Sequence, residues 1–250
     1  MSKRPDFSII TPTHNRGKNF LVQAIQSVAN QAGKGFTYEH IIVDNNSTDS
    51  TRNIVRSMAK KDKRIIYVHN PRNLGAADAL NVGFKKSRGE LIVSVDDDDM
   101  LPRSSLKFRY NFFKQNPKTK WAYGYIVYID EKNKLWKDLW EYGVPFEFKK
   151  NFLYSLLLKN FIPGGSWTLR RECIEKVGGW NPDLKTQDYD MSLKLAAAKY
   201  IPVRMDSYLY YYRLHPKQAH TLQIKTGIYK QERAHYLNLY KVTEEFLRGL

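Results

Sequence analysis

Short apolar runs alternate with amphipathic segments over the first hundred residues of the chain. Four such runs occupy residues 7–11, 40–43, 65–68 and 91–95. Between the runs, apolar residues recur at helical spacing, as Leu21, Ile25 and Val28 do in a segment that reaches about residue 31. This alternation predicts an α/β fold with a mostly parallel, Rossmann-like sheet that is flanked by helices.

The pattern changes in the second part of the chain, where the elements are longer and more aromatic. We expect helices over 106–113, 152–157 and from residue 188, strands over 121–129 and 208–213, and an aromatic-rich stretch over 136–148. Residues 163–167 contain two glycines, which fit either a plain turn or backbone that approaches a sugar or phosphate closely. The predicted organisation is one domain over 1–220, with halves 1–100 and 101–220, and a C-terminal amphipathic helical tail over 221–250.

Four consecutive aspartates, Asp96 to Asp99, directly follow the fourth apolar run. Open α/β sheets bind their ligands at the carboxyl ends of the strands, where this run must lie. Carboxylates that converge there repel one another unless a cation holds them, and Mg²⁺ or Mn²⁺ suits such hard oxygen ligands. The alternative is a solvated acidic turn.

Other polar residues follow the first two strands and would open onto the same edge. They include His14, Arg16 and Asp44. Asp44 is placed to accept hydrogen bonds from a ribose or a base, although an aspartate there could equally be a helix-entry residue. The chain contains neither a G-x-G-x-x-G nor a Walker sequence, so a bound diphosphate would depend on a metal and on basic side chains.

The amino-acid composition indicates which binding partners and which cellular compartment to expect. The formal net charge of +16 favours anionic partners such as nucleotide phosphates, nucleic acid or anionic lipid headgroups. A Cys/His metal finger and an aromatic RNA-binding signature are both missing, which speaks against nucleic acid. The single cysteine, Cys173, indicates a reducing compartment. With no apolar run near the roughly 20 residues of a membrane span and no secretory leader, we expect a cytoplasmic protein or one peripheral on a membrane.

Six short segments stand in a specific order and spacing. They are residues 7–16, 42–49, 73–75 with 79–83, 95–99, 178–181 and 187–190. They resemble the motifs of the family 2 glycosyltransferases, and the resemblance extends from residue 6 to about 215. It implies a GT-A fold and a metal-dependent, inverting hexosyl transfer from a nucleotide-diphosphate sugar, with UDP as the expected nucleotide. The acceptor would be a hydroxyl of a glycan or lipid-linked glycan, as in the synthesis of cell-surface polysaccharides.

The resemblance also assigns roles to residues. Asp188 matches the acid that acts as catalytic base, although Gln187 stands where the family often has another acid. Asp96 and Asp98 match the outer positions of the D-x-D motif: Asp98 would ligate Mn²⁺ or Mg²⁺, and Asp96 would lie toward the ribose or the metal. His215 resembles a late histidine that some members place near the metal or the diphosphate, and it is the third expected metal ligand. The donor would contact Thr11, Pro12, Arg16, Asp44, Asn73, Gly75, Asp96 and Asp97. Residues 1–100 would bind the nucleotide and residues 101–220 the acceptor.

Several alternatives stay open from the sequence. Asp188 could be only a first-turn partner of a helix dipole, and Asp190 is a rival base. The aromatic stretch could be a secondary core or an acceptor wall. The tail carries Ile228, His235, Leu239, Val242 and Phe246 on one helical face. By default this face packs on the domain or on a second copy, and the alternative is that the helix lies on an anionic membrane. The competing functions are a nucleic-acid or anionic-lipid binding protein on this fold and a nucleotidyltransferase, although the glycine-rich N-terminal signature of the latter is missing.

Overall fold

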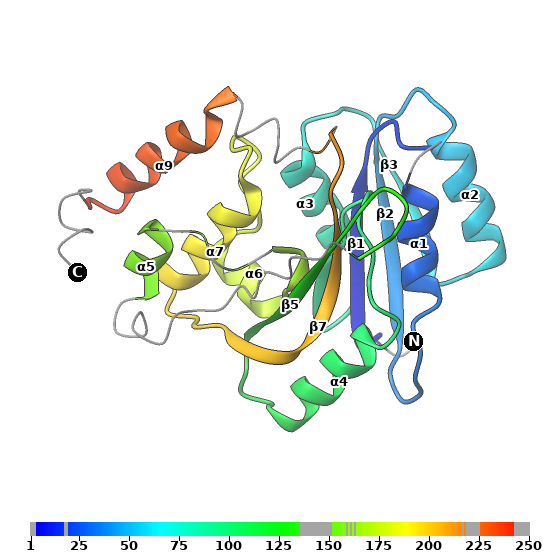
Figure 1. Cartoon of the computed structure of the whole chain (residues 1–250), viewed down its shortest axis with the longest axis horizontal. Coiled ribbons are helices and arrows are strands. Elements are labelled where there is room, and N and C mark those ends of the chain that lie inside the picture. Colours follow the sequence, from blue (N-terminus) through cyan, green and yellow to red (C-terminus); the bar gives the residue numbers. More distant parts are fainter. Residues whose placement is uncertain are drawn as a thin grey trace.

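The computed structural model describes residues 4–17, 20–135, 152–158, 160, 162, 164–216, 218 and 226–242. A seven-stranded sheet forms its centre, with the strand order β3-β2-β1-β4-β6-β5-β7 (Figure 1). The strands are β1 (Phe7–Thr13), β2 (Tyr38–Asn45), β3 (Ile65–Asn70), β4 (Leu91–Ser94), β5 (Trp121–Ile129), β6 (Thr168–Arg170) and β7 (Val203–Arg213). Only β6 runs antiparallel to its neighbours, so the predicted mostly parallel sheet is confirmed.

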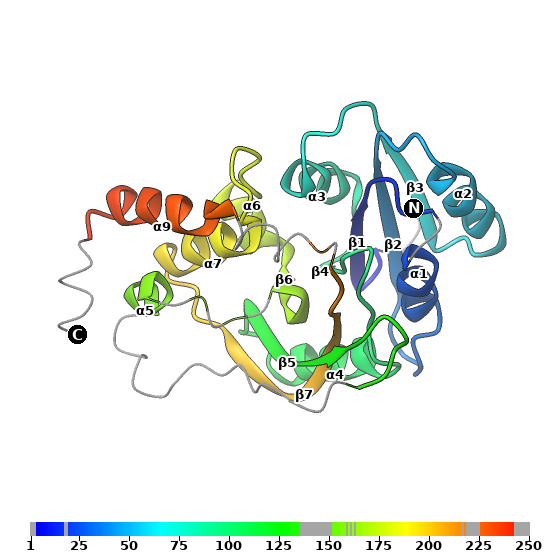
Figure 2. The same ribbon diagram turned by 45° about the horizontal axis from the view of Figure 1, so that its top comes forward.

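Helices cover both faces of this sheet. They are α1 (Leu21–Ala29), α2 (Thr51–Lys61), α3 (Ala76–Lys86), α4 (Ser105–Gln115), α5 (Phe152–Leu158), α6 (Arg171–Val177), α7 (Gln187–Ala197) and α9 (Ile228–Leu239). Successive strand residues point to opposite faces, so Ile9 belongs to the core cluster that includes residues of α1 and α4, while Ile10 belongs to the cluster that includes residues of α3, α5 and α7. Figure 2 shows α1 and α2 on one side of the strands and α3 with α6 and α7 on the other.

Most boundaries agree with the sequence pattern, but β7 begins five residues earlier than the expected start at residue 208. Its first half carries the exposed side chains Val203, Arg204 and Asp206, so it lacks the apolar run that marks a buried strand. The aromatic-rich stretch over 136–148 lies outside the described residues, so its two expected roles, a secondary core or an acceptor wall, stay predictions.

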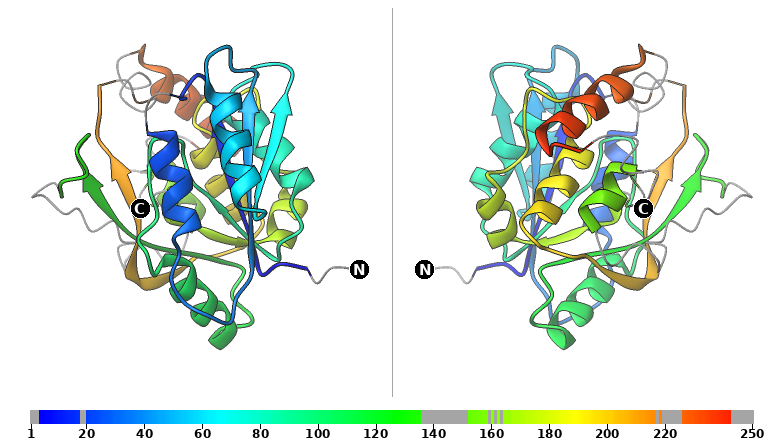
Figure 3. Two further views of the ribbon diagram at one scale, coloured as in Figure 1. Left: turned by 90° about the vertical axis from the view of Figure 1, so that its right-hand side faces the viewer. Right: turned by 90° about the vertical axis from the view of Figure 1, so that its left-hand side faces the viewer.

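The tail helix is α9, and the face expected to be buried is wrong in part. Tyr236 and Leu237 are buried, whereas His235 is exposed and Leu239 is 58% exposed. Contacts with particular neighbours set this face, because the Tyr236 ring packs edge-on against Tyr189 of α7 at 5.1 Å between centroids. The right-hand view of Figure 3 shows α9 beside α7 and α5. Val242 is buried as expected, and Phe246 lies outside the described residues.

Within the part of the chain that the structure describes, no helix combines the length and the apolar character that crossing a bilayer requires.

Candidate active site

The acidic run lies at the carboxyl edge of the sheet, between β1 and β7. After β4 ends, the amide of Val95 still donates to the carbonyl of Ile10 at 3.0 Å, which holds the run beside β1. At its other end, Met100 and Tyr211 of β7 exchange two backbone hydrogen bonds of 3.1 and 2.8 Å. Because β4 and β7 run in the same direction, the end of β7 reaches the same edge. Residues more than a hundred positions apart therefore meet there.

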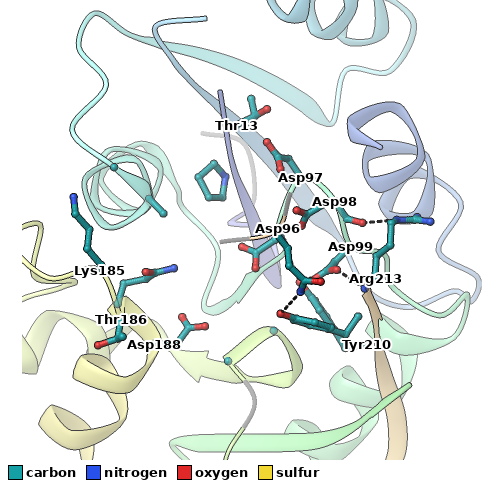
Figure 4. A pocket seen from close by; sticks show the side chains of 18 of the residues that line it. Thr13, Asp96, Asp97, Asp98, Asp99, Lys185, Thr186, Asp188, Tyr210 and Arg213 are labelled. Atoms are coloured by element: carbon teal, nitrogen blue, oxygen red, sulfur yellow. Dashed lines mark hydrogen bonds between the residues drawn. The ribbon is translucent and has the colours of Figure 1, made fainter. Parts of the chain in front are cut away.

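A cavity of about 700 Å³ opens at this edge. One wall comes from the ends of β1 and β2 and the start of α3, and the acidic run lies beside it. The facing wall comes from the turn Gly164–Ser166 and from the residues that lead into α7, while β7 supplies Tyr210 and Tyr212. Figure 4 shows Asp188 and Thr186 on one side of the cavity and Asp96 to Asp98 on the other.

Burial, and then the closeness of the other acids, raises the pKa of several carboxyl groups in the acidic run. Burial, and then the neighbouring charge of Asp188, raises the pKa of Asp96 well above its usual range. Burial and the charge of Asp98 raise the pKa of Asp97 to about 7. Asp96, Asp98 and Asp99 each offer one carboxylate oxygen, and these oxygens lie within 4.8 Å of one another. Such a concentration of carboxylates is stabilised by bound or neighbouring positive charge.

Asp99 is used within the protein. It is 2% exposed, and its carboxylate accepts a 2.7 Å hydrogen bond from the amide of Arg213 and another from the hydroxyl of Tyr210. The Tyr210 hydroxyl also accepts from the amide of Asp96 at 3.1 Å, as Figure 4 shows. Asp99 and Tyr210 thus fasten the acidic run to β7, and the carboxylates of Asp96 and Asp98 remain directed to the cavity.

The guanidinium of Arg16 and the imidazole of His215 lie against these acids. The Arg16 guanidinium is 3.3 Å from Asp97 through Nε and 3.7 Å from Asp98 through its terminal nitrogen. The His215 Nε2 lies 3.0 Å from Asp98 Oδ2. Of the three residues that the family resemblance assigns to a metal, Asp98 thus lies beside both Asp96 and His215. The third carboxylate that clusters with Asp96 and Asp98 is that of Asp99, and His215 does not line the cavity. The clustered carboxylate oxygens are hard ligands that fit Mn²⁺ or Mg²⁺, and the His215 imidazole lies next to them at Asp98.

Most of the expected donor-binding residues also line the cavity. Those that do are Pro12, Arg16, Asn73, Gly75, Asp96 and Asp97. The Asn45 carboxamide organises this wall, because its Nδ2 donates to Asn73 Oδ1 at 3.0 Å and to the carbonyl of Gly75 at 2.9 Å. Gly75 has a φ of +97°, a conformation that favours glycine, and it leads directly into α3.

Thr11 and Asp44 do not line the cavity, contrary to the expectation. Both are fully buried, and Thr11 Oγ1 is hydrogen-bonded to His40 Nε2 at 2.9 Å. Asp44 accepts from the amide of Ser47 at 2.9 Å and from the hydroxyl of Tyr67 at 2.6 Å. The residues that reach the cavity lie further along the same strands, at Thr13 and Asn45. The polar residues at the strand ends were the available signal, but the sequence does not show which of them turns inward.

Asp188 lies in the first turn of α7 and lines the cavity opposite the acidic run. Burial raises its pKa to about 6. The turn Gly164–Ser166 packs directly on it, since a Cβ added to Gly164 would lie 1.9 Å from Asp188 Oδ2. A Cβ on Gly165 would lie 2.3 Å from the Tyr210 ring. The two glycines therefore let the backbone approach these side chains, and Gly164–Ser166 forms one short 3-10 turn.

Asp190, the rival base, is directed elsewhere. It is 4% exposed and is absent from the cavity lining, although it lies only two residues from Asp188. Its Oδ2 is 3.7 Å from Lys194 Nζ, one turn along the same helix. The helical rotation between the two positions thus separates one acid that faces the cavity from one that faces the protein.

Arg109 supports the facing wall of the cavity, a role that the sequence did not predict. Its side chain is fully buried and donates to the carbonyls of Ser166, Trp167 and Leu209. Burial lowers its pKa to about 9. It ties the turn that contacts Asp188 to β7, and a single arginine in an amphipathic helix gives no sign of such a role.

Comparisons with known proteins agree with this architecture. The model of glycosyl transferase family 2 matches residues 8–178. The uncharacterized glycosyltransferase MJ1057 of Methanocaldococcus jannaschii is 26% identical over 223 residues, which are 89% of this chain and 75% of that protein. The mannosyltransferase PcManGT of Pyrobaculum calidifontis, solved with GDP-Man and Mn²⁺, superimposes with a TM-score of 0.66 at 21% identity, over 90% of this chain and 61% of that one. S. aureus TarS 1-349, solved with UDP-GlcNAc, gives 0.64 at 21% identity, over 85% and 60%.

The two solved structures are too distant in sequence to show more than the fold, which is that of the GT-A glycosyltransferases. The family match is stronger evidence, because it covers well over half of the chain and includes the acidic run. This chain therefore belongs to glycosyl transferase family 2.

Proposed function

We propose that this chain is an inverting glycosyltransferase that moves a sugar from a UDP-sugar to a hydroxyl of a glycan or lipid-linked glycan. One observation carries the proposal: a single cavity has the acidic run on one side and the raised-pKa carboxyl of Asp188 on the other. An acid that can hold a metal and an acid that can accept a proton thus face the same space. Structural relatives solved with UDP-GlcNAc and GDP-Man support a nucleotide-sugar donor.

The donor diphosphate would lie against the acidic run. Asp96, Asp98 and His215 would hold Mn²⁺ or Mg²⁺, which when bound stabilises negative charge on the departing diphosphate as a Lewis acid. Arg16 adds a guanidinium at the same place, since it already contacts Asp97 and Asp98. This cationic set would perform the task that a glycine-rich phosphate loop performs in other nucleotide-binding folds.

Asp188 would accept the proton of the acceptor hydroxyl as that oxygen attacks the anomeric carbon. With a pKa of about 6 the carboxyl is mostly ionised at neutral pH, and it is a stronger base than an exposed aspartate. The backbone at Gly164 limits the directions that its carboxylate can take. Attack from the side opposite the diphosphate inverts the configuration at that carbon.

Nucleotide binding tests the metal assignment. We expect UDP with Mn²⁺ to raise the melting temperature, and GDP and dTDP to do so less. Asp98→Ala should weaken metal-dependent UDP binding by at least the about 10-fold that changes near metal ligands cost. Asp206→Asn is the matched control, because Asp206 is an exposed acid outside the cavity.

Titration calorimetry with and without Mn²⁺ gives the affinities. Equal UDP affinity in Asp98→Ala and the unmodified protein, or binding that needs no metal, would contradict the assignment. A protein that binds none of the three nucleotides but binds RNA tightly would point to the nucleic-acid alternative.

A further inference from the structure

The N-terminus of α7, where Asp188 lies, has no cap of its own. Thr186 occupies the N-cap position, yet its side chain makes no capping hydrogen bond within the helix. The first amides of a helix have no partners within it, so a helix end that carries a functional residue needs acceptors from elsewhere.

Glu232 of α9 lies 46 and 47 positions further along the chain, and it supplies acceptors to the amide of the N-cap residue Thr186 and to the amide of Lys185 just before it. Its Oε1 accepts from the amide of Lys185 at 2.6 Å, and its Oε2 accepts from the amide of Thr186 at 2.9 Å. The same Oε2 accepts from the Thr186 hydroxyl at 2.5 Å. A carboxylate that accepts such bonds at a helix N-terminus is also favoured by the helix dipole.

Glu232 is itself held on both sides along α9. The next residue, Arg233, donates through Nε to the carbonyl of Leu157 in α5 at 3.1 Å. One turn further, Tyr236 packs against Tyr189 of α7. The carboxylate is thus presented from a helix that is anchored to α5 and to α7 itself.

Glu232 contacts residues 185 and 186 from outside the cavity, whereas the segment 185–188 itself lines the cavity. Lys185, Thr186 and Asp188 all line the cavity, whereas Glu232 does not. An ordinary packing contact between helices would bury apolar side chains and leave these backbone amides to other partners. Here the acceptor is directed at the two residues that precede the helix, two and three positions before Asp188.

We propose that Glu232 is a positioning residue for glycosyl transfer: it fixes residues 185–188 from behind and so directs the Asp188 carboxylate at the acceptor hydroxyl. The inference rests on the proposed role of Asp188. It makes α9, which lies beyond the residues matched by the family model, a part of the catalytic apparatus.

The test compares Glu232→Ala and Glu232→Gln with Gln231→Ala, an exposed neighbour on the same helix. We expect Glu232→Ala to lower kcat by about 10- to 100-fold, the cost of a small displacement of a catalytic group, with the UDP dissociation constant unchanged. Glu232→Gln keeps one acceptor oxygen and should recover part of kcat. Hydrogen exchange at the amides of Lys185 and Thr186 should accelerate in Glu232→Ala, while Gln231→Ala should match the unmodified protein in all three measurements.

A double variant distinguishes failure of this inference from failure of the proposed function. If Glu232 acts through Asp188, Glu232→Ala should cost little further turnover in an Asp188→Asn background. Full additivity there would overturn the inference, as would a folded Glu232→Ala enzyme with kcat equal to that of Gln231→Ala. A parallel loss of UDP binding and kcat would show a general structural role and would overturn it as well. If Asp188→Asn alone keeps full turnover, the base assignment fails, and unchanged amide exchange in Glu232→Ala would then separately reject the positioning contact.

Discussion

At Asp188, the surroundings of one carboxyl group set its basicity and its direction. Asp188→Asn keeps the size of the side chain but cannot accept a proton. We expect turnover to fall by about 10²- to 10⁴-fold, the usual contribution of general-base catalysis. UDP binding should persist, because the residues proposed to contact the donor lie on the other side of the cavity.

Asp190→Asn is the control, since Asp190 faces the protein beside Lys194. Turnover is measured as product formed per enzyme at saturating donor, with folding checked by melting temperature. Near-normal turnover in a folded Asp188→Asn enzyme would remove the base assignment, and a large loss at Asp190 alone would transfer it there.

The raised pKa of Asp188 predicts that its ionised form destabilises the fold. Its pKa is about 6 in the folded protein against a reference value of 3.8, so the full cost applies above pH 6 and vanishes as the pH falls through 6 toward 3.8. At about 1.4 kcal/mol per pKa unit, the cost at pH 7.5 is at most about 3 kcal/mol. Asp188→Asn should therefore be more stable than the unmodified protein toward urea at pH 7.5, and the difference should shrink at pH 4. A stability difference that is the same at both pH values would contradict the burial of this charge.

At the scale of elements, the turn Gly164–Ser166 should control two side chains separately. A methyl group at Gly164 overlaps Asp188 Oδ2, so Gly164→Ala should displace the carboxylate and lower turnover while UDP binding persists. A methyl group at Gly165 overlaps the Tyr210 ring, whose hydroxyl holds the acidic run, so Gly165→Ala should weaken Mn²⁺-dependent UDP binding. The two neighbouring substitutions serve as controls for each other. Identical effects of both on calorimetric UDP binding would argue against this division.

Local sequence predicts some of these elements but not which of their side chains face the cavity or the core. Strands β1 to β4 follow from apolar runs with polar ends, because a buried strand must be apolar on both faces. The choice between Asp44 and Asn45 at the end of β2 does not follow, since it depends on Tyr67 and Ser47, which take up the Asp44 oxygens. The buried face of α9 depends likewise on Tyr189 and on the uncapped end of α7, neither of which is visible in the apolar spacing of the tail.

At the scale of the whole molecule, topology assembles the cavity. The parallel course of β4 and β7 brings Arg213 to Asp99, 114 positions apart, and His215 to Asp98. The spacing of residues in the sequence does not predict these pairings. The proposed roles of Asp188 and His215 come from the resemblance to a family. The contacts of Arg109, Tyr210 and Glu232 become visible only in the folded structure, where their partners lie in other elements.

The net charge of +16 is also a property of the whole molecule, and it predicts attraction to anionic membranes, where a lipid-linked acceptor would lie. The exposed side chains of Arg56 and Lys63, in and after α2, lie outside the cavity lining and can be reversed without touching it. We expect sedimentation with phosphatidylglycerol vesicles at low salt and little with phosphatidylcholine vesicles. Binding should weaken as salt shortens the screening length to about 10 Å at 0.1 M, and again in the variant with Arg56→Glu and Lys63→Glu.

Each basic residue near an anionic surface contributes about 1 kcal/mol, so the double reversal should lower vesicle affinity by at least about 10-fold if α2 faces the lipid. UDP binding by the variant, measured in parallel, should be unchanged and so controls for folding. Vesicle binding that is insensitive to salt, or equal for both lipids, would show that charge does not drive it. Saturable binding to RNA without any binding to vesicles would assign the excess charge to a nucleic-acid partner instead.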